Sequence, residues 1–132
     1  MISYTDSIKG VSAKMLPGFF AGWPNPPSPG MHLKLLTNSY KVVLAIDDKT
    51  GNVVGFITAI SDGVLSAYIP LLEVLPAYQG QGIGQELTRR MLDKLSGMYM
   101  VDLSCDKELQ SFYARLGMKP AGGMSIRNPE KI

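Results

Sequence analysis

The chain has 132 residues, of which 45% are hydrophobic and 18% are charged, and its formal net charge is +2. This length and apolar content are typical of one domain with a buried core, so we expect residues 1–132 to form a single domain. The nearly balanced charge and the lack of a basic run argue against a nucleic-acid partner.

The chain has one cysteine, Cys105, so it cannot form a disulfide within itself. Residues 1–10 lack the charged start and the apolar run of a signal peptide. No apolar run approaches the ~20 residues that a membrane-spanning helix needs. These features predict a cytoplasmic protein with no membrane partner.

Residues 2–5 predict a short first strand, and residues 9–20 have a partly helical pattern. Residues 18–30, GFFAGWPNPPSPG, contain four prolines and three glycines, which interrupt regular structure and predict a stiff loop. The aromatic residues of this loop either pack onto the core or form one wall of a substrate pocket. The sequence leaves both interpretations open.

The next segments predict a helix and a hairpin. Residues 31–40 have apolar side chains at helical spacing. Residues 40–46 and 53–60 are apolar runs rich in β-branched residues, and the turn residues 47–52 join them. This pattern is typical of two antiparallel strands.

Residues 64–75 form a longer extended run that contains Pro70. A proline removes one hydrogen bond from a strand ladder, so Pro70 indicates an edge, a bulge or a break. Residues 82–96 then form the clearest helix of the chain, because apolar residues recur every four positions and charged residues fill the other faces.

The C-terminal part predicts a strand over residues 98–104, a helix over residues 106–116 and a final strand over residues 118–127. The helix between the strands that end near Leu75 and Ser104 implies a parallel crossover. The fold class is therefore α/β, with a mixed and mostly antiparallel sheet flanked by helices.

A glycine-rich turn, QGQGIG over residues 79–84, leads directly into the long helix. Free N–H groups and the positive end of the helix dipole make such a turn an anion site, although it also serves simply as a sharp reversal. A nucleotide-triphosphate loop needs Lys followed by Ser or Thr after its last glycine, and Gln85-Glu86 stand there instead. The dinucleotide fingerprint fails too, because its third glycine is replaced by Gln85 or Leu87.

This turn resembles the Q/R-x-x-G-x-G/A signature of the GNAT superfamily of N-acetyltransferases. Residues 72–78, LEVLPAY, are similar to the approach to that signature, and residues 111–118, SFYARLGM, resemble the family's FY-x-x-x-GF segment. The resemblance covers residues 40–120 and is poor over residues 1–35. It implies a GNAT-like sheet with a splayed parallel strand pair, and one acetyltransferase domain over residues 1–132.

The resemblance also implies where acetyl-coenzyme A binds. The backbone amides of the turn would hold its pyrophosphate, and the strand before the turn would pair with its pantetheine arm. Backbone amides near Val74 and Leu75 would polarise the acetyl carbonyl like an oxyanion hole. The implied binding residues are Leu72, Val74, Leu75, Gln79, Gly80, Gln81, Gly82, Ile83, Gly84 and Gln85.

Two residues are candidates for proton transfer. By periodicity alone Tyr113 would be a core residue of its helix, but it matches the family tyrosine that protonates the departing thiolate, and the resemblance favours this catalytic role. Glu73 is the candidate general base because it lies in an otherwise apolar strand, although an exposed glutamate would fit the same position. Tyr68 is a second candidate base, and the only histidine, His32, is expected at the surface.

One position departs from the family pattern. Asp106 stands where family members often carry an asparagine that contacts the coenzyme, so it is either a coenzyme contact or a helix cap. The neighbouring Cys105 suggests a covalent acyl-enzyme. No histidine is close to it in the sequence, and the resemblance implies direct transfer.

The sequence therefore predicts an N-acetyltransferase that moves an acetyl group from acetyl-coenzyme A to a primary amine of a small molecule or peptide, without a metal. A non-catalytic coenzyme A-binding sensor would have the same fold, and another acyl donor or an alcohol acceptor also stays open. A homodimer is an expectation at the level of the family.

Overall fold

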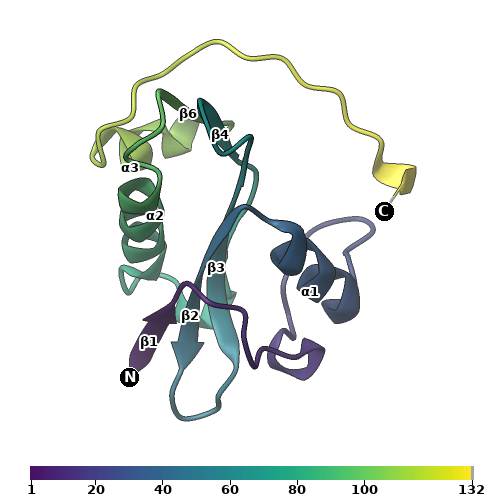
Figure 1. The fold of residues 1–132 in the computed structure, drawn as a ribbon. Coiled ribbons are helices and arrows are strands. Elements are labelled where there is room, and N and C mark those ends of the chain that lie inside the picture. Colours follow the sequence, from purple (N-terminus) through teal and green to yellow (C-terminus); the bar gives the residue numbers. More distant parts are fainter. Residues whose placement is uncertain (132) are drawn as a thin grey trace.

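The computed structural model describes residues 1–131 as a mixed sheet flanked by helices (Figure 1). The strands are β1 (Ile2–Thr5), β2 (Lys41–Asp47), β3 (Val53–Ser61), β4 (Ser66–Ile69), β5 (Leu72–Val74) and β6 (Met100–Leu103). The helices are α1 (Pro29–Asn38), α2 (Ile83–Lys94) and α3 (Gln110–Ala114), with short 3-10 helices at Ala13–Met15, Pro76–Tyr78, Lys107–Leu109 and Pro129–Lys131. No helix within residues 1–131 is long and apolar enough to cross a bilayer.

The sheet has the order β1-β2-β3-β4-β6, and β5 pairs with β3 off this path. All the pairs are antiparallel except β4 with β6, which run parallel. The predicted fold class, a mostly antiparallel mixed sheet with one parallel pair and flanking helices, is confirmed.

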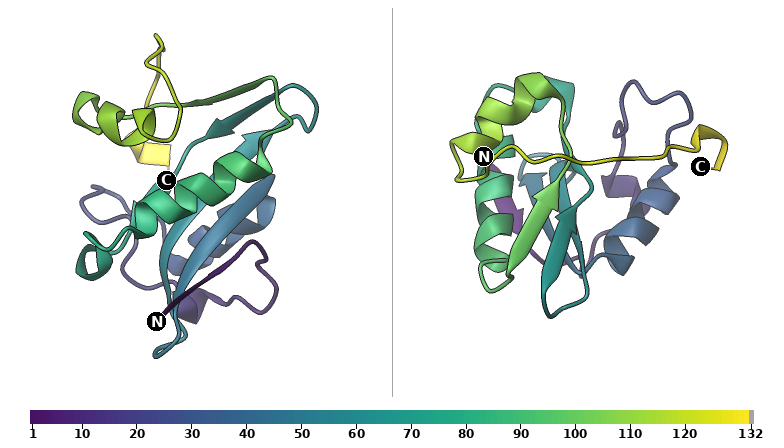
Figure 2. Two further views of the ribbon diagram at one scale, coloured as in Figure 1. Left: turned by 90° about the vertical axis from the view of Figure 1, so that its left-hand side faces the viewer. Right: turned by 90° about the horizontal axis from the view of Figure 1, so that it is seen from above.

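The two central strands bury both of their faces. Figure 2 shows α2 on one face of the sheet and α1 on the other. Alternate residues of β2 enter the two cores: Val43 and Ala45 pack with α2, and Val42 and Leu44 pack on the side of α1. This two-sided burial explains why the strand reads as an unbroken apolar run.

Gly55 lets α2 lie close to the sheet. A Cβ at this position of β3 would lie 3.1 Å from the Leu87 side chain and 3.2 Å from that of Ile83, closer than nearly all real contacts. Glycine therefore fixes the height of α2 above β3, and with it the position of the turn that precedes the helix.

The long extended run is broken as Pro70 indicated. Its first half, β4, pairs with β6 from Ser66 opposite Met100 to Ile69 opposite Leu103. Its second half, β5, pairs with β3 alone among the described strands. The predicted parallel crossover therefore involves β4, and the sheet opens between β5 and β6.

Two predicted elements near the N-terminus are corrected. Residues 9–20 form only a single 3-10 helix at Ala13–Met15, because Gly10 and Gly18 have φ values of 83° and 88° and Pro17 lies between. Residues 31–40 are helical as predicted, and α1 begins slightly earlier, at Pro29, where the Ser28 hydroxyl accepts a hydrogen bond from the Met31 N–H.

The C-terminal predictions are also corrected. The helix expected over residues 106–116 is divided into the 3-10 helix and the short α3. The strand expected over residues 118–127 is absent, and this segment leaves α3 as an irregular run, drawn in yellow in Figure 1. Pro120, Gly122 and Gly123 disfavour a ladder there.

His32 is buried, contrary to its expected surface position. Its ring lies 4.4 Å from that of Phe56 and about 5 Å from those of Phe19 and Phe20, between centroids. Neither ring nitrogen has a hydrogen-bond partner within residues 1–131. Burial lowers the pKa of His32 to about 4, so the imidazole is neutral at pH 7.

The burial of His32 predicts a loss of stability on mild acidification. The pKa of His32 is about 4 in the folded state and ~6.5 in the unfolded chain, so the unfolded chain binds the extra proton as the pH falls through 6.5. The free energy of unfolding should therefore fall between pH 6.5 and 4, by at most about 3 kcal/mol. His32→Leu, which has no proton to bind, should flatten this part of the curve, measured by urea unfolding at pH 7.5, 6 and 5. Parallel curves for the two proteins would contradict the prediction.

Candidate active site

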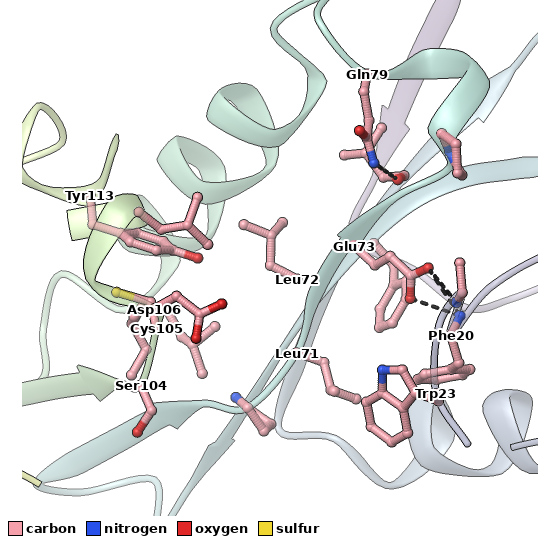
Figure 3. Close-up of a pocket in the computed structure, with 18 residues that line it drawn as sticks. Phe20, Trp23, Leu71, Leu72, Glu73, Gln79, Ser104, Cys105, Asp106 and Tyr113 are labelled. Atoms are coloured by element: carbon pink, nitrogen blue, oxygen red, sulfur yellow. Dashed lines mark hydrogen bonds between the residues drawn. The ribbon is translucent and has the colours of Figure 1, made fainter. Parts of the chain in front are cut away.

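A cavity of about 520 Å³ opens where the sheet divides (Figure 3). Most of its lining comes from four segments: the loop between the 3-10 helix at residues 13–15 and α1, the chain from the end of β4 through β5, the end of β6 with the residues after it, and α3. Phe56 of β3 and two residues that follow β5, Pro76 and Gln79, complete it. Because these segments are remote in sequence, the break between β4 and β5 is what brings them together.

The backbone of β5 presents polar groups to this cavity. The Leu71 carbonyl and the Leu75 N–H both hydrogen-bond to β3, at 3.1 and 2.9 Å. Successive residues of an antiparallel strand alternate in direction, so the N–H and C=O groups of Leu72 and Val74 face away from β3. The Gln79 side chain donates to the Val74 carbonyl at 3.0 Å. The N–H of Val74 points away from β3, as its expected role in polarising the acetyl carbonyl requires. For Leu75 this expectation is corrected, because its N–H donates to the Val54 carbonyl of β3.

Glu73 binds the loop of residues 18–30. Both of its carboxylate oxygens accept from the Phe20 N–H, at 2.9 and 3.0 Å, and one also accepts from the Ala21 N–H at 3.4 Å. Phe20 is buried and has a φ of 64°, which bulky residues rarely adopt. Glu73 therefore stabilises a strained turn while its carboxylate lines the cavity.

Tyr113 lies across β5 from Glu73, and its hydroxyl points into the cavity (Figure 3). Burial, with a smaller effect of the neighbouring Cys105, raises the pKa of Tyr113 above its usual value of 10.0. The phenol is therefore protonated throughout the neutral range, and its hydroxyl makes no side-chain hydrogen bond within residues 1–131. A free, protonated donor aimed at a cavity is suited to general acid catalysis.

The glycine-rich turn borders the same cavity through Gln79. Gly80 and Gly82 have φ values of 80° and 84°, and Gly82 is the N-cap of α2. A Cβ would meet nothing within 4 Å at either position, so backbone conformation and not space requires glycine there. No backbone hydrogen bond within the described chain uses the N–H groups of residues 80–85. Such free donors at the start of a twelve-residue helix are suited to binding an anion.

The structure thus gathers only part of the predicted set around the cavity. The predicted residues that line it are Leu72, Glu73, Val74, Gln79, Asp106 and Tyr113. Residues 80–85 lie outside its lining, in the adjacent turn, and Leu75 packs against the core. Tyr68 also lies outside, where its hydroxyl donates to Ser104 at 2.9 Å.

Asp106 and Cys105 both line the cavity. Asp106 is the N-cap of the 3-10 helix at residues 107–109, but its side chain makes no cap hydrogen bond. Cys105 has no histidine beside it, because His32 lies in the aromatic cluster on the other face of the sheet. No group of three or more His, Cys, Asp or Glu side chains within residues 1–131 could hold a metal ion.

Sequence reasoning missed the link between Glu73 and Phe20, which are 53 positions apart. The aromatic residues of the loop were the only signal, and they left open whether the loop packs on the core or lines a pocket. Phe20 does both, because it is buried and also lines the cavity, together with Trp23.

Comparisons with known proteins concern the sequence and the fold as a whole. A model of the acetyltransferase (GNAT) family matches residues 11–118. A crystal structure from Deinococcus radiodurans R1, provisionally described as an acetyltransferase, is 46% identical with a TM-score of 0.93, over 98% of this chain and 90% of its own. A GNAT-family acetyltransferase from Streptococcus pneumoniae TIGR4 is 29% identical with a TM-score of 0.71, over 97% of this chain and 98% of its own.

The glucosamine-6-phosphate N-acetyltransferase of Arabidopsis thaliana shares the fold alone, at 12% identity and a TM-score of 0.71 over 97% of this chain and 98% of its own. A search among curated proteins gave no match.

The role of Glu73 predicts how two substitutions should differ. Glu73→Ala leaves the buried Phe20 N–H without an acceptor and should lower the free energy of unfolding by about 1–3 kcal/mol. Glu73→Gln keeps one acceptor oxygen and should cost less. Trp23 is the only tryptophan, so its fluorescence reports on the loop, and acrylamide should quench it more strongly in Glu73→Ala.

The matched control is Glu108→Ala, which removes an exposed glutamate that lines no part of this cavity. It should change neither stability nor quenching. If Glu73→Ala behaves like this control, Glu73 does not hold the loop.

Proposed function

This chain belongs to the GNAT family of acetyltransferases, and we propose that it transfers an acetyl group from acetyl-coenzyme A directly to a primary amine of a small molecule or peptide. The observation that carries the proposal is one cavity lined by both Tyr113, whose hydroxyl is protonated, and Val74, whose N–H points away from β3, next to a turn with free N–H groups. One acetyltransferase domain over residues 1–132 and a cytoplasmic location stay predictions.

The proposed site for the coenzyme's diphosphate is the turn from Gln79 to Gln85. The N–H groups of residues 80–85 have no backbone partner within the described chain, whereas that of Gln79 donates to the Pro76 carbonyl at 3.3 Å. The dipole of α2 adds a positive potential at the same point. The side chain of Gln79 also ties the turn to β5, which fixes the distance between the diphosphate site and the cavity.

The proposed thioester site lies against β5. Leu72 and Val74 direct their backbone groups away from β3, so they offer hydrogen bonds to the amide groups of the pantetheine arm. The N–H of Val74 would then stabilise the negative charge that develops on the acetyl oxygen. The contact of Asp106 with the coenzyme stays a prediction.

In the proposed reaction the amine nitrogen attacks the acetyl carbon, the carbon–sulfur bond breaks, and the proton of Tyr113 passes to the departing sulfur. The proton that the nitrogen releases on becoming an amide then restores Tyr113. The raised pKa of Tyr113 ensures that this proton is present at neutral pH. An alkyl ammonium has a pKa of ~10.4, so the acceptor must lose a proton before attack. Glu73 is the proposed base, because its carboxylate lines the cavity and a carboxylate has about four acceptor sites, more than its contacts with the loop use.

A screen of primary amines tests the proposed function. Purified protein with acetyl-coenzyme A should release free thiol above background for at least one amine, with acetylated amine formed in equal amount. Tight binding of coenzyme A without thiol release for any amine would contradict the proposal and favour a non-catalytic sensor. Alcohols of the same skeletons and acyl donors of different chain length test the remaining alternatives.

Tyr113→Phe should lower kcat by about 10²-fold or more, because the thiolate then leaves without a proton donor. The dissociation constant for coenzyme A, measured by calorimetry, should change less than twofold, since the turn is untouched. Tyr99→Phe is the matched control, because Tyr99 is an exposed tyrosine that lines no part of the cavity. An unchanged kcat in Tyr113→Phe would remove Tyr113 from the mechanism.

A further inference from the structure

The loop of residues 18–30 forms one end of the cavity, opposite Tyr113. There Phe20, Trp23 and Leu71 line the cavity together with Glu73, whose carboxylate points toward the Phe20 backbone (Figure 3). Phe20 is buried and contacts the ring of Trp23 edge-on, with 5.1 Å between ring centroids. Trp23 itself is 42% exposed, so an indole surface is open at this end. We call these four residues the aromatic end of the cavity.

The charges of the cavity are all negative. Glu73 and Asp106 are the only Asp or Glu residues among its described lining residues, and none of these is Lys, Arg or His. Neither carboxylate takes part in an ion pair within residues 1–131. The cavity is therefore negative although the whole chain carries a formal charge of +2.

From this geometry we infer that the acceptor is a small cationic amine with an aromatic or alkyl body and no phosphate or carboxylate, bound at the aromatic end of the cavity. The inference rests on the proposed function and names the substrate class of the same site. An ammonium group finds the carboxylate of Glu73 and the face of Trp23, and both attract a cation. The exposed ring of Trp23, which packs against the ring of Phe20, offers apolar surface to the body of the amine.

If the acceptor carried an anionic group, that group would lose its hydrating water in the cavity, and no cationic side chain among the described lining residues would replace it. A carboxylate on the carbon next to the amine would lie beside Glu73, and a phosphate on a longer body would find only backbone groups and Asp106. Because like charges repel strongly in a partly buried site, the cavity selects against such molecules.

Pairs of amines that differ only by an anionic group test the inference. The pairs are phenethylamine with phenylalanine, tyramine with tyrosine, and hexylamine with 6-aminohexanoate. In each pair the amine without the anionic group should have a kcat/KM at least tenfold higher, in thiol release at 150 mM salt. An equal or reversed preference would overturn the inference and leave the proposed function standing.

Fluorescence of Trp23 measures amine binding without turnover. Phenethylamine should change the emission in a saturable way, and phenylalanine should need at least tenfold higher concentration. If no amine releases thiol but this selectivity is present, the proposed function fails and the amine site stands. If neither thiol release nor selective binding is found, both fail.

Two variants of Trp23 sharpen the test. Trp23→Ala should raise KM for phenethylamine about tenfold or more with a smaller effect on kcat, because a binding surface is lost and the proton donor is retained. Trp23→Arg places a cation at the aromatic end and should shift the preference within each pair toward the anionic member. Tyr99→Ala removes an exposed aromatic residue outside the cavity and should change neither value. An unaltered preference and KM in both Trp23 variants would overturn the inference.

Discussion

Pro70 has no N–H group to donate, and the ladder changes partners at this residue. Before it, β4 pairs with β6, and after it, β5 pairs with β3 alone among the described strands. The cavity lies where the chain leaves β6 and turns to pair with β3. The outward backbone groups of β5 have no described strand beside them, and apart from the Val74 carbonyl, which accepts from Gln79, they are free to bind a ligand. Tyr113 and Glu73 lie on opposite sides of this strand.

Each side of the cavity depends on a different part of the core. On one side, α2 packs close over Gly55, which sets the position of the free N–H groups at its start. On the other side, the loop of residues 18–30 is held by the carboxylate of Glu73 and by the ring cluster of Phe20, Phe56 and His32. The side of the cavity at the start of α2 therefore depends on a regular helix. The opposite side, the aromatic end, depends on a loop whose conformation is set by tertiary contacts.

The sequence predicted those features that depend on local pattern. The hairpin of β2 and β3, the helix α2 and the break at Pro70 follow from apolar periodicity and from the chemistry of single residues. The aromatic end of the cavity did not follow, because the contact between Glu73 and Phe20 joins positions 53 apart and requires a positive φ at a bulky residue. The strand expected over residues 118–127 is absent for a local reason, since Pro120, Gly122 and Gly123 disfavour a ladder there.

Unfavourable backbone conformations and unpaired polar groups lie mainly beside the aromatic end of the cavity. Phe20 has a φ of 64°, and His32 is buried with both ring nitrogens unpaired within the described chain. Both features cost free energy, and both lie in the one aromatic cluster that supports the end of the cavity. Unfavourable conformations persist only where many surrounding contacts hold them in place. They are most frequent at functional sites. The turn before α2 has no such cost, since glycine adopts its positive φ values freely. The unfavourable conformations therefore lie beside the aromatic end, where the choice of amine would be made.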